Sequence, residues 1–362
     1  MFIMPLAPDL SAWLRLSLTA GLGGDAMRKL LLAFGGPEQV LGASRVALTA
    51  VVTGKIADAI LDGDLHGDPA AVEAWLADTN NHVVTLADAE YPQALLQTPD
   101  PPPLLYVKGR RELLNQPAIA IVGSRNATAQ GKLTAESFAT ALSNAGLCVV
   151  SGMALGIDAA AHRGGLAGLS STIAIVGTGL DKVYPARNRD LAHAIADKGA
   201  MVSEFALGTP PLATNFPRRN RLISGMTRGC LVVEAALSSG SLITARISNE
   251  LGKDVFAIPG SIHSTLSKGC HVLIKQGAKL VDDAADILGE LRLPLPAGAD
   301  GGAEPDTFRH PLLAHLAFDP CDIDTLAGRA GLPVYEVSAA LTQLELQGVV
   351  AGLPGGLWQR IS

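Results

Sequence analysis

The chain has 362 residues, of which 48% are hydrophobic and 17% are charged. This composition excludes a disordered protein, and the length exceeds what one ordinary core needs, so we expect two or three domains. The net charge of −6 argues at first against a nucleic-acid ligand.

The N-terminus reads MFIMPLAPDLSAWL and has neither a basic start nor a long apolar segment before a cleavage site. Because no run of about 18 apolar residues follows, we expect no signal peptide, no membrane contact and a cytoplasmic protein. The four cysteines are far apart in the sequence, so we expect buried, reduced thiols, no metal site and no cofactor.

Residues 1–79 are predicted to form a helical SAM-like domain. The segment GLGGDAMRKLLLAFGGPEQVL at 21–41 resembles a helix-hairpin-helix unit, in which Pro37 can open the second helix. Its turn carries Asp25, where a phosphate-gripping turn would favour a neutral or basic residue. A structural role is therefore at least as well supported as contact with DNA.

Residues 80–291 are predicted to form a Rossmann-like α/β domain with an N-terminal extension. The extension, 80–116, is expected to be a connector with one short strand. Six apolar runs of strand length then alternate with segments of helical period, which indicates a doubly wound parallel sheet covered on both faces. The six runs are 118–123, 147–152, 172–179, 200–205, 230–235 and 254–260.

The last part of the chain is predicted to be a linker, 292–306, and a winged-helix domain, 307–362. Two helical segments and a Gly-rich hairpin support the second prediction. Residues 307–362 carry three arginines and five acids, and the second helical segment has no basic residue. We therefore expect contact with a protein, or a spacer role, and not the reading of a DNA groove.

Small and polar residues follow several of the predicted strands. Carboxyl ends of parallel strands meet at one crevice, where glycines let backbone N–H groups approach a phosphate and helix N-termini add positive potential. Together they predict a site for a phosphate-bearing ligand, although tight turns without a ligand remain an alternative. The residues are Gly123, Ser124, Arg125, Ser151, Gly152, Gly177, Gly179, Lys182, Ser238, Ser239, Gly240, Ser241 and Thr244.

The segment 215–225, NFPRRNRLISG, is the most informative. Residues 117–290 carry 16 Lys and Arg against 13 Asp and Glu, and 215–228 contains four arginines and no acid. Pro217 suits a helix start, and arginines in a first turn oppose the helix dipole, so an anion would explain them. A solvated basic face, or salt bridges to nearby acids, is the alternative. Phe216 could stack on a base.

The common catalytic motifs are missing: the sequence has no GxxxxGK[ST], GxGxxG, GxSxG or HExxH. Asp158 and His162 lie four residues apart and could act as acid and base. We favour instead an Asp158 that caps or orients the loop at Ser151-Gly152, and a structural His162. Glu234 is the best single catalytic candidate, and an Asn or Arg partner would explain it equally well.

Six segments in order resemble the DNA-processing protein A (DprA/Smf) family: VGSR (122–125), SGMALGIDAAAHRGGL (151–166), GTGLDKVYPARN (177–188), NFPRRNRLISGM (215–226), VVEAALSSGSLITA (232–245) and AIPGSI (257–262). The resemblance covers about residues 85–290. It implies a protein that binds single-stranded DNA taken up in natural transformation, protects it and helps to load the RecA recombinase, without catalysis.

The resemblance also implies roles for residues. Arg125, Lys182, Phe216, Arg218, Arg219 and Arg221 would contact the strand. The phosphate and base pockets would be formed by Gly123, Ser124, Ser151, Gly152, Asn220, Gly240 and Ser241, and Asn215 would also bind the strand. A homodimer through the Rossmann-like domain is implied in the same way.

Two other functions compete with this one. A nucleotide-processing enzyme of the lysine-decarboxylase-like (phosphoribohydrolase) fold would have a similar crevice, but such enzymes carry PGGxGTxxE. The corresponding residues here, 239–244, lack the matching Glu. The other alternative is an assembly scaffold that uses both small domains.

Overall fold

The structure is a computed structural model that describes residues 8–294, 310–353 and 355–361. The predicted linker, 292–306, lies outside the described residues except for 292–294. Among the described residues, no helix combines the length and the apolar character that crossing a membrane requires. All four cysteines are buried and unpaired, as the sequence predicts.

The N-terminal part is helical. Pro37 is the first residue of its helix, and Gly35 ends the helix before it with φ of 90°, a conformation that favours glycine. The apolar core of these helices is continuous with Tyr106 of the sheet, whose ring meets Trp75 edge to face at 6.0 Å. The helices are α1 (Pro8–Ser17), α2 (Gly24–Phe34), α3 (Pro37–Leu41), α4 (Arg45–Thr49), α5 (Gly54–Asp62) and α6 (Pro69–Leu76).

The central sheet has nine strands in the order β1-β2-β6-β5-β4-β3-β7-β8-β9. The strands from β6 to β9 in this order are parallel, whereas β2 is antiparallel to β6 and β1 is antiparallel to β2. The predicted doubly wound fold is thus confirmed. The strands are β1 (Asn81–Thr85), β2 (Leu104–Gly109), β3 (Ala118–Val122), β4 (Cys148–Ser151), β5 (Thr172–Ile175), β6 (Ala200–Ser203), β7 (Gly229–Val232), β8 (Asp254–Ala257) and β9 (Lys279–Leu280).

The prediction of one short strand in 80–116 was wrong, because this segment contributes both β1 and β2. β1 is an edge strand that pairs only with β2, in the register Val83↔Tyr106. Its sequence, NHVVT, is short and only half buried, so it lacks the continuous apolar run of the parallel strands. The helix α7 (Gln93–Leu96) lies between the two strands in sequence.

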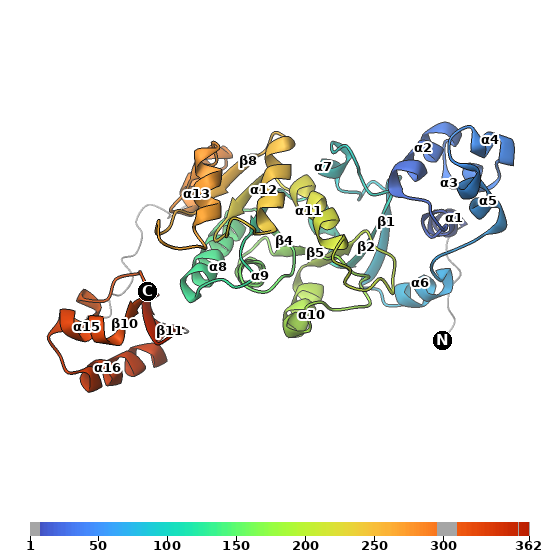
Figure 1. The fold of residues 1–362 in the computed structure, drawn as a ribbon. Helices are drawn as coiled ribbons and strands as arrows, with labels where there is room; N and C mark the ends of the chain where they lie inside the picture. The colour runs from blue at the N-terminus through green and yellow to red at the C-terminus, as the bar shows by residue number, and fades with distance from the viewer. Residues whose placement is uncertain (1–7, 295–309, 354, 362) are drawn as a thin grey trace.

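Helices cover both faces of the sheet, as Figure 1 shows. Side chains on one face of β3, such as Ile119 and Ile121, join a core with α8 (Ala129–Asn144), α9 (Ile157–Ala167) and α14 (Ala284–Glu290). Side chains on the other face join a core with α11 (Asn215–Met226), α12 (Ser241–Glu250) and α13 (Lys268–Lys275). The remaining helical segments are α10 (Arg189–Lys198), η1 (Arg111–Asn115) and η2 (Ala186–Asn188).

The C-terminal part has a separate apolar core that includes Leu326, Leu341 and Val350. Two helices and a three-stranded sheet in the order β10-β12-β11 form the predicted winged helix, which is therefore confirmed. Its elements are η3 (Pro311–Ala314), β10 (Cys321–Asp322), α15 (Ile323–Ala330), α16 (Val334–Leu346), β11 (Val350–Leu353) and β12 (Leu357–Arg360).

Candidate nucleic-acid interface

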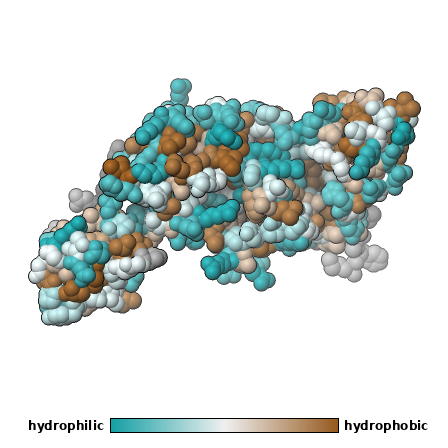
Figure 2. Space-filling view, in the orientation of Figure 1, coloured by the Kyte–Doolittle hydropathy of each residue, from teal (hydrophilic) through white to brown (hydrophobic). Residues whose placement is uncertain are grey.

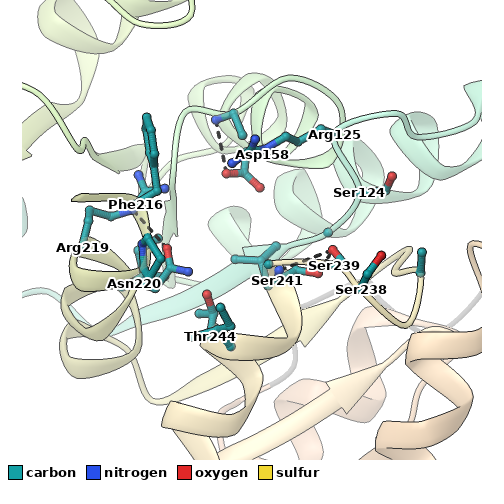
Figure 3. Close-up of a pocket in the computed structure, with 18 of the residues that line it drawn as sticks. Ser124, Arg125, Asp158, Phe216, Arg219, Asn220, Ser238, Ser239, Ser241 and Thr244 are labelled. Carbon is teal, nitrogen blue, oxygen red and sulfur yellow. Dashed lines mark hydrogen bonds between the residues drawn. The ribbon is translucent and has the colours of Figure 1, made fainter. Parts of the chain in front are cut away.

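The sheet has a switch point between β3 and β7. From β3 the chain proceeds through β4, β5 and β6 to one side, and then returns to β7 and proceeds to the other side. In doubly wound sheets, ligands bind at this point, beyond the carboxyl ends of the strands. A cavity of about 710 Å³ lies there, and Figure 3 shows many of its residues.

Most of the lining comes from the loops after β3, β4 and β7 and from α11, and the loops after β5, β6 and β8 and the start of α12 contribute the rest. Gly156 lets the first two loops meet: its φ is +78°, and a Cβ atom there would lie 2.2 Å from the carbonyl oxygen of Ser124. Only glycine fits this approach. The cavity residues are Val122, Gly123, Ser124, Arg125, Asn126, Ala154, Asp158, Tyr184, Pro211, Ala213, Phe216, Pro217, Arg219, Asn220, Ile223, Ala236, Ser238, Ser239, Gly240, Ser241, Ile243, Thr244 and Leu266.

Arg219 supplies a buried cation to the cavity and is only 5% exposed. Its guanidinium donates to the carbonyl oxygens of Gly152, at 2.7 Å, and Ile175, and to Oδ1 of Asn220. Burial lowers the pKa of Arg219 to about 10, which leaves it charged at neutral pH. Among the charges nearby, Asp158 raises this pKa and Arg125 contributes to lowering it, so an anion beside the two guanidinium groups would relieve their repulsion.

An aromatic ring lies beside these cations. Phe216 has the guanidinium of Arg125 over its face, 5.9 Å from the ring centroid, and the ring of Tyr184 at 5.6 Å. Arg125 and Tyr184 are exposed and Phe216 is partly exposed. A partly exposed ring at the edge of a basic cavity can accept a stacked base.

Hydroxyl groups line the side of the cavity at the start of α12. Oγ of Ser239 and Oγ of Ser241 lie 2.7 Å apart, and Gly240 precedes the helix without a side-chain cap. Figure 3 shows both serines across the cavity from Asp158. Hydroxyls and N–H groups at a helix N-terminus are favourable partners for a phosphate.

Arg218 and Arg221 do not line this cavity. Both form ion pairs with Glu204, whose side chain is 3% exposed, and Arg221 also pairs with Asp100 at 3.2 Å. Arg28 of α2 pairs with Asp100 at 2.6 Å, so the network reaches the N-terminal helices. The salt-bridge alternative that the sequence left open therefore describes these two arginines.

The three candidate catalytic side chains all have structural partners. Asp158 accepts N–H groups of Gly152 and Ala154 at 3.1 and 3.3 Å, which confirms that it orients the loop after β4. His162 contacts Oγ1 of Thr172 at 2.7 Å, and burial lowers its pKa to about 3, so it is a neutral structural residue as predicted.

Glu234 accepts the backbone N–H and the hydroxyl of Thr128 at the start of α8, at 2.9 and 2.6 Å. The alternative of an Asn or Arg partner for Glu234 was wrong, because the groups that it binds are those of Thr128, the N-cap of α8. This use of both carboxylate oxygens makes Glu234 part of the scaffold under the cavity.

Eight of the fourteen predicted binding residues line the cavity: Gly123, Ser124, Arg125, Phe216, Arg219, Asn220, Gly240 and Ser241. Besides Arg218 and Arg221, four others lie outside its lining. Ser151 and Asn215 donate to backbone carbonyls of Ile121 and Gly177, Gly152 packs under Arg219, and exposed Lys182 donates to the carbonyl oxygen of Gly208.

Several cavity residues were not among the predicted binding residues. Ser238, Ser239 and Thr244 follow the same strand as Gly240 and were among the residues that predicted the crevice, although not among the fourteen expected to bind the strand. Asn126 follows Arg125 directly, and Tyr184 lies two residues after Lys182. Pro211 and Ala213 come from the loop before α11, which carries no recognisable pattern.

Two family models match the chain. One is described as DNA recombination-mediator protein A and matches residues 82–292. The other is described as the DprA winged helix domain and matches residues 296–356.

Individual proteins are similar over much of the chain. Protein Smf of Escherichia coli is 43% identical over 294 residues, which are 78% of this chain and 78% of that protein. The DNA processing protein DprA of Streptococcus pneumoniae is 47% identical over 206 residues, 57% of this chain and 73% of that protein.

Two solved structures are also similar. DNA processing protein A from Streptococcus pneumoniae aligns with a TM-score of 0.69 and 37% identity over 79% of this chain and 99% of that one. A structure that describes the single-stranded DNA binding mode of DNA processing protein A from Helicobacter pylori aligns with a TM-score of 0.53 and 31% identity, over 58% of this chain and 96% of that one.

Proposed function

This chain belongs to the DNA recombination-mediator protein A family, also called DprA or Smf, and we propose that it binds single-stranded DNA in the cavity at the switch point of its sheet. One observation carries the proposal: a buried cation, Arg219, an exposed cation, Arg125, and an available ring, Phe216, face the same cavity. This combination of positive charge and stacking surface suits a single strand.

Each part has a role in the proposal. Arg125 and Arg219 attract the phosphates, and Ser239 and Ser241 at the start of α12 hold one of them. Phe216, with Tyr184 beside it, stacks on a base. Since stacking tolerates every base, we expect little sequence preference.

The predicted contacts of Lys182, Arg218 and Arg221 with the strand stay predictions. The ion pairs of Arg218 and Arg221 with Glu204 favour a structural role for these two. Protection of the strand, loading of RecA during natural transformation, dimerisation through the Rossmann-like domain and a cytoplasmic location complete the proposal.

The proposal assigns binding and not catalysis, because the carboxylates that a nucleotide-processing enzyme would use have other partners here. Both carboxylate oxygens of Glu234 bind Thr128, and Oδ2 of Asp158 holds the backbone of its own loop. A hydrolase assay on nucleoside monophosphates checks this part, and turnover that cavity substitutions abolish would favour the alternative.

The test of binding is a competition experiment with a fluorescent single-stranded oligonucleotide. We expect unlabelled single strands to displace it at far lower concentration than duplex of the same sequence. The variant Phe216→Ala should bind from about fivefold to more than a hundredfold more weakly, since stacking contributes about 1–3 kcal/mol per base. Displacement by duplex at equal or lower concentration contradicts the proposal.

The matched control is Arg163→Ala. This substitution also removes one arginine of the same domain, but Arg163 pairs with Glu136 on the surface of α8 and α9 and does not line the cavity. Its affinity should stay near that of the unaltered chain, whereas that of Arg125→Ala should fall.

A further inference from the structure

The cavity contains one group that a phosphate would avoid. Asp158 lies in its lining and is 7% exposed, among cations and hydroxyls that suit an anion. In Figure 3 its carboxyl group lies on the α9 side of the cavity, across from Asn220 and Ser241. A phosphate placed against this carboxylate would be repelled, so this part of the cavity needs a different partner.

Only one of its two carboxylate oxygens is used by the loop. Oδ2 accepts both backbone N–H groups, those of Gly152 and Ala154, and neither of these N–H groups donates to Oδ1. Burial raises the pKa of Asp158, whereas the charge of Arg219, the two backbone donors and the hydroxyl of Ser151 act in the opposite direction. For Oδ1 to act as an acceptor, its partner has to be a hydrogen-bond donor.

A metal ion is a poor candidate for this partner. The described part of the chain contains no group of three or more His, Cys, Asp and Glu side chains that could hold one. Within a DNA strand, phosphates carry no proton at neutral pH and the deoxyribose of an internal nucleotide has no hydroxyl. The remaining donors are the N–H groups of the bases.

We propose that Asp158 is a base anchor, whose free carboxylate oxygen accepts an N–H group from the Watson–Crick edge of one unpaired base. The inference rests on the proposed binding of single-stranded DNA and adds a specific contact to it. Phe216 stacks on the face of a base, and Asp158 accepts from its edge.

This contact accounts for two properties together. Each of the four bases has at least one N–H group on its Watson–Crick edge, so the anchor tolerates every sequence. In a duplex these N–H groups are bound to the opposite strand, so the anchor selects unpaired DNA. Cations alone do not select unpaired DNA, because a duplex presents phosphates too.

The experiment is a double-mutant cycle between protein and DNA. Thymine has a single N–H, at N3, and methylation of N3 removes it. We compare oligothymidylate with the same oligonucleotide methylated at N3 of every thymine, so that no shift of register can restore the contact. The protein partners are the unaltered chain and Asp158→Asn, whose amide oxygen can keep the two loop N–H groups and whose NH₂ replaces the free acceptor.

We expect methylation to weaken binding to the unaltered chain by between about tenfold and a hundredfold, the range for a hydrogen bond to a charged group. Asp158→Asn should bind oligothymidylate more weakly, and methylation should then have little further effect. Thermal unfolding of the variant, with Arg163→Ala as control, monitors the fold.

Other outcomes contradict the inference. Equal binding of both oligonucleotides by the unaltered chain overturns it whether or not the variant folds. A methylation penalty that persists in Asp158→Asn is steric and also overturns it. If the unaltered chain binds neither oligonucleotide, the proposed function fails together with the anchor.

Discussion

Arg218, Arg219 and Arg221 have three different environments although they lie within one short stretch. Successive residues on a helix point about 100° apart, so their side chains diverge. Arg219 points to the cavity, Arg218 is 52% exposed and lies over Phe205, and Arg221 is largely buried against Glu204 and Asp100. The sequence indicated a basic helix, but it could not show which arginine faces acids from distant segments.

This difference predicts distinct effects on the salt dependence of binding. Arg125→Ala should flatten the log–log slope of affinity against salt by about 0.7 and leave the melting temperature nearly unchanged, since it removes one phosphate contact from an exposed position. The double variant R218A/R221A should keep the slope. It should lose about 1–3 kcal/mol of stability, because buried Glu204 loses both ion-pair partners.

Salt titrations and thermal melts of the same two variants test this pair of expectations. A flatter slope for R218A/R221A at unchanged stability would place these arginines on the path of the DNA after all.

At the scale of elements, the sequence predicts what depends on local pattern. Continuous apolar runs predict the Val- and Ile-rich parallel strands. The glycines after these runs predict the tight turns that end the strands. The edge strand β1 was missed because it is half buried. Helix α11 begins at Asn215 and not at Pro217, so Arg218 ends the first turn and Arg219 and Arg221 follow it. Contacts between elements, such as that of α11 with the loop after β4, depend on tertiary packing and left no local signal.

That contact predicts the effect of a single methyl group. A Cβ atom at Gly152 would lie 2.4 Å from Nη2 and 2.7 Å from Cζ of Arg219. Gly152→Ala should therefore displace the guanidinium, destabilise the fold by about 1–3 kcal/mol and weaken binding of single-stranded DNA.

Gly289→Ala is the matched control, because Gly289 lies within α14 and a Cβ atom there has open space. Chemical denaturation and oligonucleotide titration of both variants give the comparison. Unchanged affinity in Gly152→Ala would mean that the position of Arg219 does not matter for binding.

At the scale of the whole molecule, the parts differ in how they join the sheet. The N-terminal helices share an apolar core with β2 and α10, and Arg28 and Asp100 add a polar connection. The winged helix has a core of its own. Figure 2 shows hydrophilic residues over much of the visible face of the molecule, with apolar residues in separate patches. The net charge of −6 belongs to a chain whose cavity nevertheless carries Arg125 and Arg219.

The separate core predicts that the winged helix is dispensable for binding DNA. A chain that ends at residue 294 should fold, and it should keep most of its affinity for single strands, because none of the cavity residues lies beyond Leu266. Oligonucleotide titration and thermal melting of the shortened chain check this. A large loss of affinity with an intact melt would assign DNA contacts to the winged helix.

The neighbouring positions of β3 and β7 also have a consequence during synthesis on the ribosome. Ala120 pairs with Cys230, so the two halves of the cavity come from segments that are translated far apart in time. Until β7 and the start of α12 have been synthesised, the nascent chain contains Arg125 but not Ser239 and Ser241, which lie on the other side of the cavity. Long-range pairing of this kind is slow relative to local structure. The complete cavity therefore forms only after these later segments have been synthesised.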